Sequence, residues 1–323
     1  MAPRYLIIGA SGFVGCRLFQ VLGRGNAVPT FNRRPMDGGV AFDARTMRLA
    51  DVLLKWHRGL THAFILQGVT AIDTCARDPQ GTAEINVAGT KRIIDDLLEH
   101  GVVPVFASSD AVFDGSRGLW GEDDPANPIL TYGRQKVDVE RYLLGKSDAA
   151  LVLRLAKVVA ATPGAGDMLG GWLDSLENGQ TIRCASDQIF SPVTVDDAAD
   201  AFVRLAEGGL RGLFHVCGPR PVSRLELLRT LLAEAARYRE FPERIVPCSI
   251  RDFDFAEPRP FDTSMSPHKL YAVLGKAFED SRETCRKLAA ARYGGRPVSQ
   301  SRPLNEANDS RANTQHRGHR TEP

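Results

Sequence analysis

The stretch RYLIIGASGFVGCRLFQ, residues 4–20, decides the fold of this chain. Its apolar first part predicts a buried strand, and its second part predicts a helix that begins at a glycine. Gly9, Gly12 and Gly15 lie between the two, where glycine lets the backbone turn tightly and approach a ligand. The unpaired N–H groups at the start of such a helix attract a phosphate. The pattern predicts a dinucleotide pyrophosphate site, and its alternative is a tight turn that only packs the helix on the strand.

Strand and helix patterns alternate from this stretch to about residue 160. Further apolar runs of strand type occupy residues 27–34, 39–43, 61–68, 102–109 and 149–159. Helical patterns fill the intervals at residues 46–59, 81–101 and 131–145. Alternation of this kind indicates βαβ units, and strands that are apolar throughout suit a parallel sheet covered by helices on both faces. The sequence therefore predicts an α/β fold with a Rossmann-type, doubly wound parallel sheet.

The second half of the chain has a different organisation. Helical patterns at residues 168–179, 195–208 and 223–238 alternate with loops, and a strand pattern occupies residues 212–218. We expect residues 1–160 to form a dinucleotide-binding domain and residues 161–293 to form mainly a smaller substrate-binding part, interleaved with the sheet. Residues 294–323 contain no aromatic and few apolar residues, a composition that predicts a disordered tail.

Composition excludes several classes of partner. The chain has 43% hydrophobic residues, a net charge of +2 and a pI near 8.2, so nothing in its charge favours nucleic acid or a membrane surface. No apolar run is long enough to span a membrane or to form a signal peptide, which predicts a cytoplasmic protein. The six cysteines show no metal-ligand spacing with one another or with histidine, so no metal is expected. A homodimer is the expected assembly if the chain is not monomeric.

The second strand indicates which cofactor binds. An NAD site usually has an acidic residue at the end of this strand to hold the ribose, whereas this chain has Asn32, Arg33 and Arg34. Two arginines suit the 2′-phosphate of NADP(H), which we favour over NAD(H); the alternative is a solvated basic turn. Asp43 is expected to hold the adenine amino group. The remaining predicted cofactor contacts come from the glycine turn, the end of the fourth strand and the later helix: Ser11, Phe13, Val14, Gln67, Gly68, Tyr132 and Lys136.

The fifth strand ends in a pair of serines, Ser108 and Ser109, at the sheet edge where ligands bind in such folds. Tyr132 and Lys136 follow on the next helix, and a spacing of four places them on one helical face. A neighbouring ammonium group and a cationic nicotinamide are expected to lower the pKa of a tyrosine, which would make Tyr132 a general acid. The serines are expected to face the carbonyl oxygen that receives this proton.

These motifs resemble those of the extended short-chain dehydrogenase/reductase family, and within it the dTDP-4-dehydrorhamnose reductases. The resemblance covers about residues 4–292. SSDAVFDG is similar to that branch's S-T-D-Y-V-F-D-G, and YGRQKVDVE is similar to Y-G-K-T-K-x-x-x-E. The resemblance implies a catalytic set of Ser109, Tyr132 and Lys136, supported by Asn86. The late stretch RPFDTSMSPHKL resembles a loop that reaches the substrate in that branch, so Arg259 is expected to meet a pyrophosphate, with an ordinary exposed arginine as the alternative.

The chain departs from that branch at positions that face the sugar. Lys157 replaces an aromatic residue after the sixth strand, and Ala111 replaces a tyrosine. Lys157 either meets an anionic group of the substrate or is a surface lysine whose stem lies along apolar groups. Asp110 is predicted to contact the substrate, although its spacing also suits a turn or a cap, as does that of Asp114.

The sequence therefore predicts an NADPH-dependent reductase that acts on a keto group of a nucleotide-linked sugar. Ser108, Asp110, Lys157 and Arg259 are the expected substrate contacts. One alternative is an epimerase or dehydratase of the same family. Another is a non-catalytic NADP-binding subunit that resembles the regulatory subunit of methionine adenosyltransferase. The sequence leaves the sugar and the nucleotide open.

Overall fold

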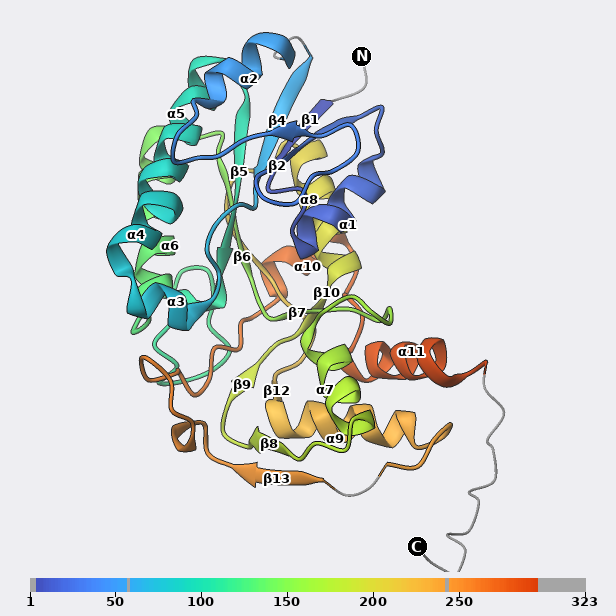
Figure 1. Ribbon diagram of the computed structural model, residues 1–323. Helices are drawn as coiled ribbons and strands as arrows, with labels where there is room; N and C mark the ends of the chain where they lie inside the picture. The colour runs from blue at the N-terminus through green and yellow to red at the C-terminus, as the bar shows by residue number, and fades with distance from the viewer. Residues whose placement is uncertain (1–3, 57–58, 242–243, 296–323) are drawn as a thin grey trace, which may run out of the picture.

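The computed structural model describes residues 4–56, 59–241 and 244–295, and its centre is a seven-stranded parallel sheet (Figure 1). The strand order is β11-β6-β5-β4-β1-β2-β3. The strands are β1 (Arg4–Ile8), β2 (Ala27–Phe31), β3 (Val40–Ala41), β4 (Leu60–Ile65), β5 (Val103–Ser109), β6 (Leu151–Leu155) and β11 (Gly212–Val216). The order reverses between β1 and β4, which is where doubly wound sheets bind dinucleotides. The predicted Rossmann-type sheet is confirmed.

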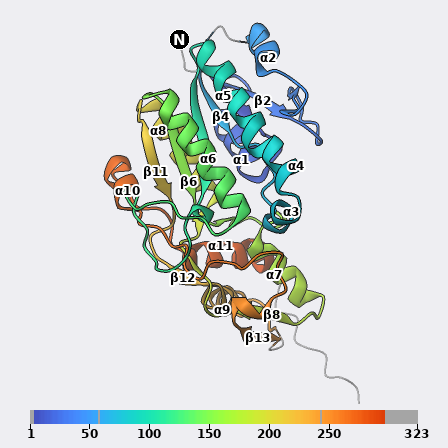
Figure 2. The same ribbon diagram turned by 90° about the vertical axis from the view of Figure 1, so that its left-hand side faces the viewer.

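Helices cover both faces of the sheet, as Figures 1 and 2 show from two sides. One face carries α1 (Phe13–Leu22) and α8 (Val195–Glu207); the other carries α2 (Leu49–Trp56), α5 (Thr90–Glu99) and α6 (Thr131–Lys146). Successive side chains of β1 alternate between the two cores, with Ile7 packing toward α1 and Leu6 toward α5. Burial on both faces explains why the strands are apolar throughout rather than alternating.

The helix predicted over residues 81–101 begins two residues earlier, ends two residues earlier and is less regular than expected. It consists of α4 (Pro79–Ala83), a π-helical turn at Glu84–Gly89, and α5. A short helix that was not predicted, α3 (Ile72–Arg77), precedes it. π-helical turns are rare and occur often at functional sites. This one places Asn86 toward the loop that follows β4.

The remaining elements form a smaller part beyond the carboxyl ends of the sheet strands (Figures 1 and 2). Its helices are α7 (Met168–Glu177), α9 (Arg224–Ala235) and α11 (Ser281–Tyr293). Short strands pair beside them: β7 (Val158–Val159) with β10 (Val193–Thr194), β9 (Ile189–Phe190) with β12 (Val222–Ser223), and β8 (Ile182–Ala185) with β13 (Ile245–Cys248). Meanwhile α8, β11 and α10 (His268–Leu274) pack with the main sheet, although they follow residue 160. The sequence did not predict β8 and β13.

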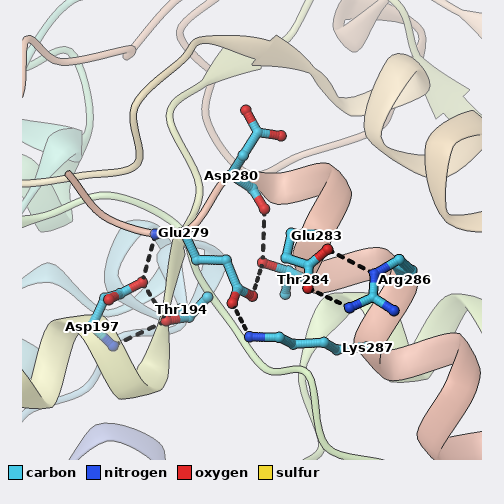
Figure 3. Close-up of polar contacts among 8 residues, drawn as sticks. All are labelled: Thr194, Asp197, Glu279, Asp280, Glu283, Thr284, Arg286 and Lys287. Carbon is cyan, nitrogen blue, oxygen red and sulfur yellow. Dashed lines mark hydrogen bonds and ion pairs between the residues drawn. The ribbon is translucent and has the colours of Figure 1, made fainter.

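A polar cluster joins α8 to the segment before α11 (Figure 3). Thr194 caps α8 by accepting a hydrogen bond from the Asp197 N–H, and its hydroxyl donates to the Asp197 carboxylate over 2.8 Å. The same carboxylate accepts the Glu279 N–H over 3.1 Å. The Glu279 side chain in turn binds Thr284 and Lys287 on α11. This cluster therefore links a helix of the main sheet to a helix of the smaller part.

Two further predictions concern the tail of the chain and membrane-spanning helices. The predicted disordered tail, residues 294–323, lies outside the described residues apart from Gly294 and Gly295. Within the described part of the chain, none of the helices combines the length and the apolar character that crossing a membrane requires.

Candidate active site

The glycine turn after β1 is built so that only glycine fits. Gly9 has a φ of +91°, and a Cβ atom there would lie 2.8 Å from the backbone nitrogen of Gln67. A Cβ atom on Gly15 would lie 2.4 Å from the Gly9 carbonyl oxygen, so this glycine lets α1 pack against the turn. Gly12 is the N-cap residue of α1 and leaves the first N–H groups of the helix facing outward. The turn therefore supplies backbone donors where a pyrophosphate would bind.

A cleft of about 610 Å³ opens in front of this turn. Ser11, Gly12 and Phe13 line one wall. The loop after β7 and the start of α8 line the other, with Thr162, Ala165, Gly166, Val195 and Asp196. Val14 packs against the core beneath α1 instead of lining the cleft. The cleft has the size of a ligand site and lies where the strand order reverses.

The three residues predicted to choose the cofactor are all exposed after β2, and Arg34 also lines the cleft. Asp43, the expected adenine contact, does not line it. The Arg45 side chain and the Arg45 N–H bind the Asp43 carboxylate, each over 2.9 Å. These hydrogen bonds from Arg45 lower the pKa of Asp43. Arg45 therefore already binds the carboxylate that was expected to hold the adenine.

The loop after β4 forms the opposite rim of the glycine turn. Gln67 donates to the Thr90 hydroxyl over 2.8 Å, and Gly68 has a φ of +150°, which few other residues adopt. Asn86 accepts the Val69 N–H over 2.7 Å and donates to the Val69 carbonyl over 2.9 Å. Its amide also donates to Gln135 of α6 over 2.8 Å. Asn86 therefore ties this loop to the helix that carries Tyr132 and Lys136.

Tyr132 and Lys136 are both buried, one turn apart on α6. The Lys136 Nζ lies 5.5 Å from the centre of the Tyr132 ring and donates to the Ala107 carbonyl over 2.7 Å. Within the described residues the Tyr132 hydroxyl has no hydrogen-bond partner of its own. Ser109 ends β5; its hydroxyl donates to Asp110 over 3.0 Å and accepts the Ala111 N–H over 3.2 Å. These side chains lie at the carboxyl edge of the sheet.

The charges at this site differ from the sequence-based expectation. We expected Lys136 to lower the pKa of Tyr132, but burial raises it, and the Asp110 carboxylate adds to the rise. Burial also lowers the pKa of Lys136 to about 8. Desolvation disfavours the charged form of both groups and is the largest cause of both pKa shifts. Tyr132 therefore keeps its proton at neutral pH, as a general acid must.

Ser108 was expected to face the substrate, and this expectation is wrong. Neighbouring residues of a strand point to opposite faces, so Ser108 points under α6 when Ser109 points to the site. The Ser108 hydroxyl donates to the buried carboxylate of Glu140. Arg154 binds the same carboxylate through its Nη2 over 2.7 Å and lies 3.4 Å from His215. Ser108 thus belongs to a buried ion-pair network that also contacts the fully buried His215.

A second cavity of about 220 Å³ lies between the main sheet and the smaller part. Asp110, Lys157 and Arg259, three predicted substrate contacts, all line it. Asp110 also accepts a hydrogen bond from the Thr263 hydroxyl over 3.2 Å, and burial raises its pKa. Asp114, by contrast, accepts the Ser116 N–H over 2.8 Å and forms a turn, as its spacing suggested.

Arg259 is buried beneath the wall of this cavity. One guanidinium nitrogen binds Asp73 of α3, and the group stacks 4.4 Å from the centre of the Phe255 ring. Its Nη1 atom is buried without a hydrogen-bond partner in the described structure. A buried polar atom without a partner is costly, so this nitrogen marks a place for an anionic ligand.

The sequence did not single out Arg224, Gln188 or Thr263, which line the same cavity. Arg224 begins α9 and donates to Gln188 over 3.0 Å. Burial lowers its pKa, and it has no ion pair within the described residues. No local pattern marks these positions, because they come together only when the smaller part packs against the sheet.

Comparison with known proteins identifies the family. The model of the RmlD substrate binding domain family matches residues 3–293. The chain belongs to that family. This RmlD-family chain is 25% identical over 301 residues to the dTDP-4-dehydrorhamnose reductase of Mycolicibacterium smegmatis, covering 91% of the chain and 87% of that protein. It is also 29% identical over 158 residues to the probable low-salt glycan biosynthesis reductase Agl14 of Haloferax volcanii. That match covers 48% of this chain and 53% of Agl14.

Solved structures agree with the fold of the RmlD-family chain. The dTDP-4-dehydrorhamnose reductase of Bacillus anthracis in complex with NADP superposes with a TM-score of 0.78 at 20% identity, covering 89% of this chain and 99% of that one. MoeE5 in complex with UDP-glucuronic acid and NAD gives a TM-score of 0.74 at 21% identity, covering 90% and 98%. The expected class is confirmed: the protein is an NAD(P)-dependent oxidoreductase of the extended short-chain dehydrogenase/reductase type.

Proposed function

We propose that this protein reduces a keto group on a nucleotide-linked sugar with NADPH. The observation that carries the proposal is that Ser109, Tyr132 and Lys136 lie at the carboxyl edge of the sheet, where Tyr132 packs against Ala111 of the smaller cavity. The cleft at the glycine turn suits a dinucleotide, and the smaller cavity is lined by cations. A substrate carbonyl bound beside Tyr132 would receive a hydride from the cofactor at its carbon and a proton from Tyr132 at its oxygen.

The cleft residues fit NADPH. The glycine turn would hold the pyrophosphate, and Arg33 and Arg34 would hold the 2′-phosphate. When bound, NADPH supplies the hydride. Tyr132 donates its hydroxyl proton to the substrate oxygen, and Ser109 orients that oxygen by donating a hydrogen bond. Lys136 would hold the cofactor ribose and favour the tyrosinate that remains after proton transfer.

The smaller cavity supports a nucleotide sugar as the substrate. Arg259 has an unsatisfied, buried guanidinium nitrogen, and arginine pairs well with the oxygens of a diphosphate. The volume of about 220 Å³ is below the usual range of about 300–1,000 Å³ for whole ligands, so only the sugar and the diphosphate beside Arg259 would lie inside, and the nucleoside would lie outside. On this proposal residues 161–293 are the main substrate-binding part, and the reaction takes place in the cytoplasm.

The test follows NADPH consumption by absorbance with a panel of UDP- and dTDP-linked 4-ketosugars. At least one should be reduced, and Tyr132→Phe should lower kcat by about 10²- to 10⁴-fold with little change in NADPH affinity. Tyr142→Phe is the matched control, because Tyr142 lies on the same helix but bonds to Asp95 outside the site. Full turnover by the Tyr132 variant on a reduced ketosugar would show that another group supplies the proton.

One observation favours an epimerase or dehydratase as a second candidate. The raised pKa of Asp110 lets it exchange protons nearer neutral pH, which such reactions require. However, Ala111 follows Asp110, so the acid–base pair expected of a dehydratase is incomplete. Product analysis distinguishes the two classes: a reductase consumes one NADPH for each sugar converted, whereas an epimerase or dehydratase consumes none.

A further inference from the structure

The cations around the smaller cavity form two separate groups. Arg259 stands against α3, where Asp73 neutralises it. Lys157 and Arg224 line the cavity from the end of β6 and the start of α9, and burial, together with the Arg224 guanidinium, lowers the pKa of Lys157. A nucleotide diphosphate accounts for Arg259 but leaves this second group unexplained.

Neither member of the second group has a carboxylate partner. Within the described residues, Lys157 forms no side-chain hydrogen bond or ion pair, and the side-chain bonds of Arg224 go to the neutral Gln188 amide and Met168 sulfur. Arg224 is half-buried, and burial of an unpaired charge is costly. An anion bound between or beside Lys157 and Arg224 in the substrate complex would offset this free-energy cost.

The neighbouring acids do not fill that role. Asp110 is the one carboxylic acid among the described residues that line the cavity, and hydrogen bonds from Ser109 and Thr263 already engage it. Asp167 also acts on Lys157, but both of its oxygens accept backbone N–H groups, those of Ala160 and Gly170. Among the described residues, no carboxylate therefore binds Lys157 or Arg224, and their positive charge lies at the cavity wall.

The sheet register places that charge beside the sugar instead of the nucleotide. Ser109 of β5 pairs with Leu155 of β6, and Lys157 lies two residues further on. The backbone carbonyl of Lys157 accepts the Val193 N–H over 3.0 Å, which fixes this residue at the junction of the two parts. Two residues of extended chain cover about 6.6 Å. Lys157 thus projects from the strand end nearest the catalytic serine, where the reacting sugar ring would lie.

We propose that Lys157 and Arg224 bind a carboxylate on the sugar, so that the substrate is a nucleotide-linked uronic acid or its keto form. This inference rests on the proposed function for the orientation of the substrate. It adds that the sugar of the substrate is acidic, and it makes Lys157 a residue that determines substrate specificity.

Equilibrium binding tests the inference without turnover. The probes are UDP-glucuronate and UDP-glucose, which differ only by the carboxylate, together with the corresponding dTDP-linked pair. With NADP present, calorimetry should show at least about tenfold tighter binding of the uronate. Lys157→Met and Arg224→Met should each remove most of this preference and leave the affinity for the neutral sugar within about threefold. Lys276→Met, an exposed lysine that does not line the cavity, is the control for charge.

Each other outcome decides the matter. Equal affinity of the wild-type protein for uronate and neutral sugar would overturn the inference, as would failure to bind either pair. An equal loss of affinity for both sugars in Lys157→Met would also overturn it, because the lysine would then contact the diphosphate.

If selective uronate binding appears but no ketosugar is reduced, the carboxylate site stands and the reductase proposal fails. If neutral ketosugars are reduced and the uronate has no advantage, the reductase proposal stands alone. Melting temperatures of the variants confirm folding.

Discussion

At the scale of single residues, burial controls the chemistry of the site more than charge pairing does. Tyr132 and Lys136 lie close enough to influence each other, yet each is held toward its neutral form. For the tyrosine this is useful, because the proton stays in place until the substrate oxygen takes it. For the lysine, burial has a consequence that can be measured, since the proposed mechanism needs its ammonium form to stabilise the tyrosinate.

The pKa of Lys136, about 8, predicts the pH dependence of activity. Its ammonium form dominates below this pKa and is lost as the pH rises through it, so kcat/KM for NADPH should fall above about pH 8, by up to about tenfold per pH unit. A lysine of ordinary pKa would not titrate until about pH 10. Initial rates measured between pH 6 and pH 10 check this, with circular dichroism to confirm that the protein stays folded. A flat profile to pH 10 would contradict the role given to Lys136.

Residue identities were predictable where a motif joins neighbours in sequence, and not where the fold joins distant segments. The spacing of Tyr132 and Lys136 implied their shared helical face, and the structure places them so. Strand alternation should have excluded Ser108 from the site, because adjacent strand residues cannot both face one ligand. Arg224 could not be found from sequence, since its neighbour Gln188 is 36 positions away.

At the scale of elements, we expect the glycine turn and the end of β2 together to determine which cofactor binds. The exposed end of β2 carries Arg33 and Arg34 beside the cleft and no acidic residue. The double variant Arg33→Ala/Arg34→Ala should therefore bind NADPH about tenfold more weakly or worse and leave NADH binding almost unchanged. The wild-type preference for NADPH should shrink as salt is raised, because these side chains are exposed.

Calorimetric titration of both cofactors measures this preference. Arg141→Ala/Arg211→Ala is a matched control, because it removes the same charge from exposed positions that do not line the cleft. If wild-type protein binds the two cofactors equally well, the arginines form only a solvated turn and the NADPH prediction is wrong.

The sequence predicted the regular elements of the main sheet because their signals are local. Apolar runs of strand length and a glycine turn are enough to place β1, α1 and the strands that follow. The π-helical turn at Glu84–Gly89 was not predictable, since its residues also suit an ordinary helix. The paired strands β8 and β13 were missed as well, because each is four residues long and depends on a partner distant in sequence.

At the scale of the whole molecule, the proposed site depends on how the smaller part is held against the sheet. The smaller cavity is lined by Asp110 and Lys157, which follow the ends of β5 and β6, and by Arg224 of the smaller part. The polar cluster in Figure 3 is one of the links between the two, because the Asp197 carboxylate serves both the cap of α8 and the segment before α11. The proposed site can form only while such links hold the two parts together.

Replacing Asp197 with alanine should therefore destabilise the protein as a whole. The change removes one acceptor from the Thr194 hydroxyl and one from the Glu279 N–H, a loss of about 1–2 kcal/mol for hydrogen bonds at a partly buried helix cap. Asp197→Asn, which keeps one side-chain acceptor, should recover part of that loss. Glu283→Ala, which breaks a surface pair with Arg286 in the same region, should leave the melting temperature unchanged. Thermal unfolding followed by circular dichroism compares the three variants. If Asp197→Ala melts at the same temperature as the wild-type protein, this cluster does not hold the two parts together.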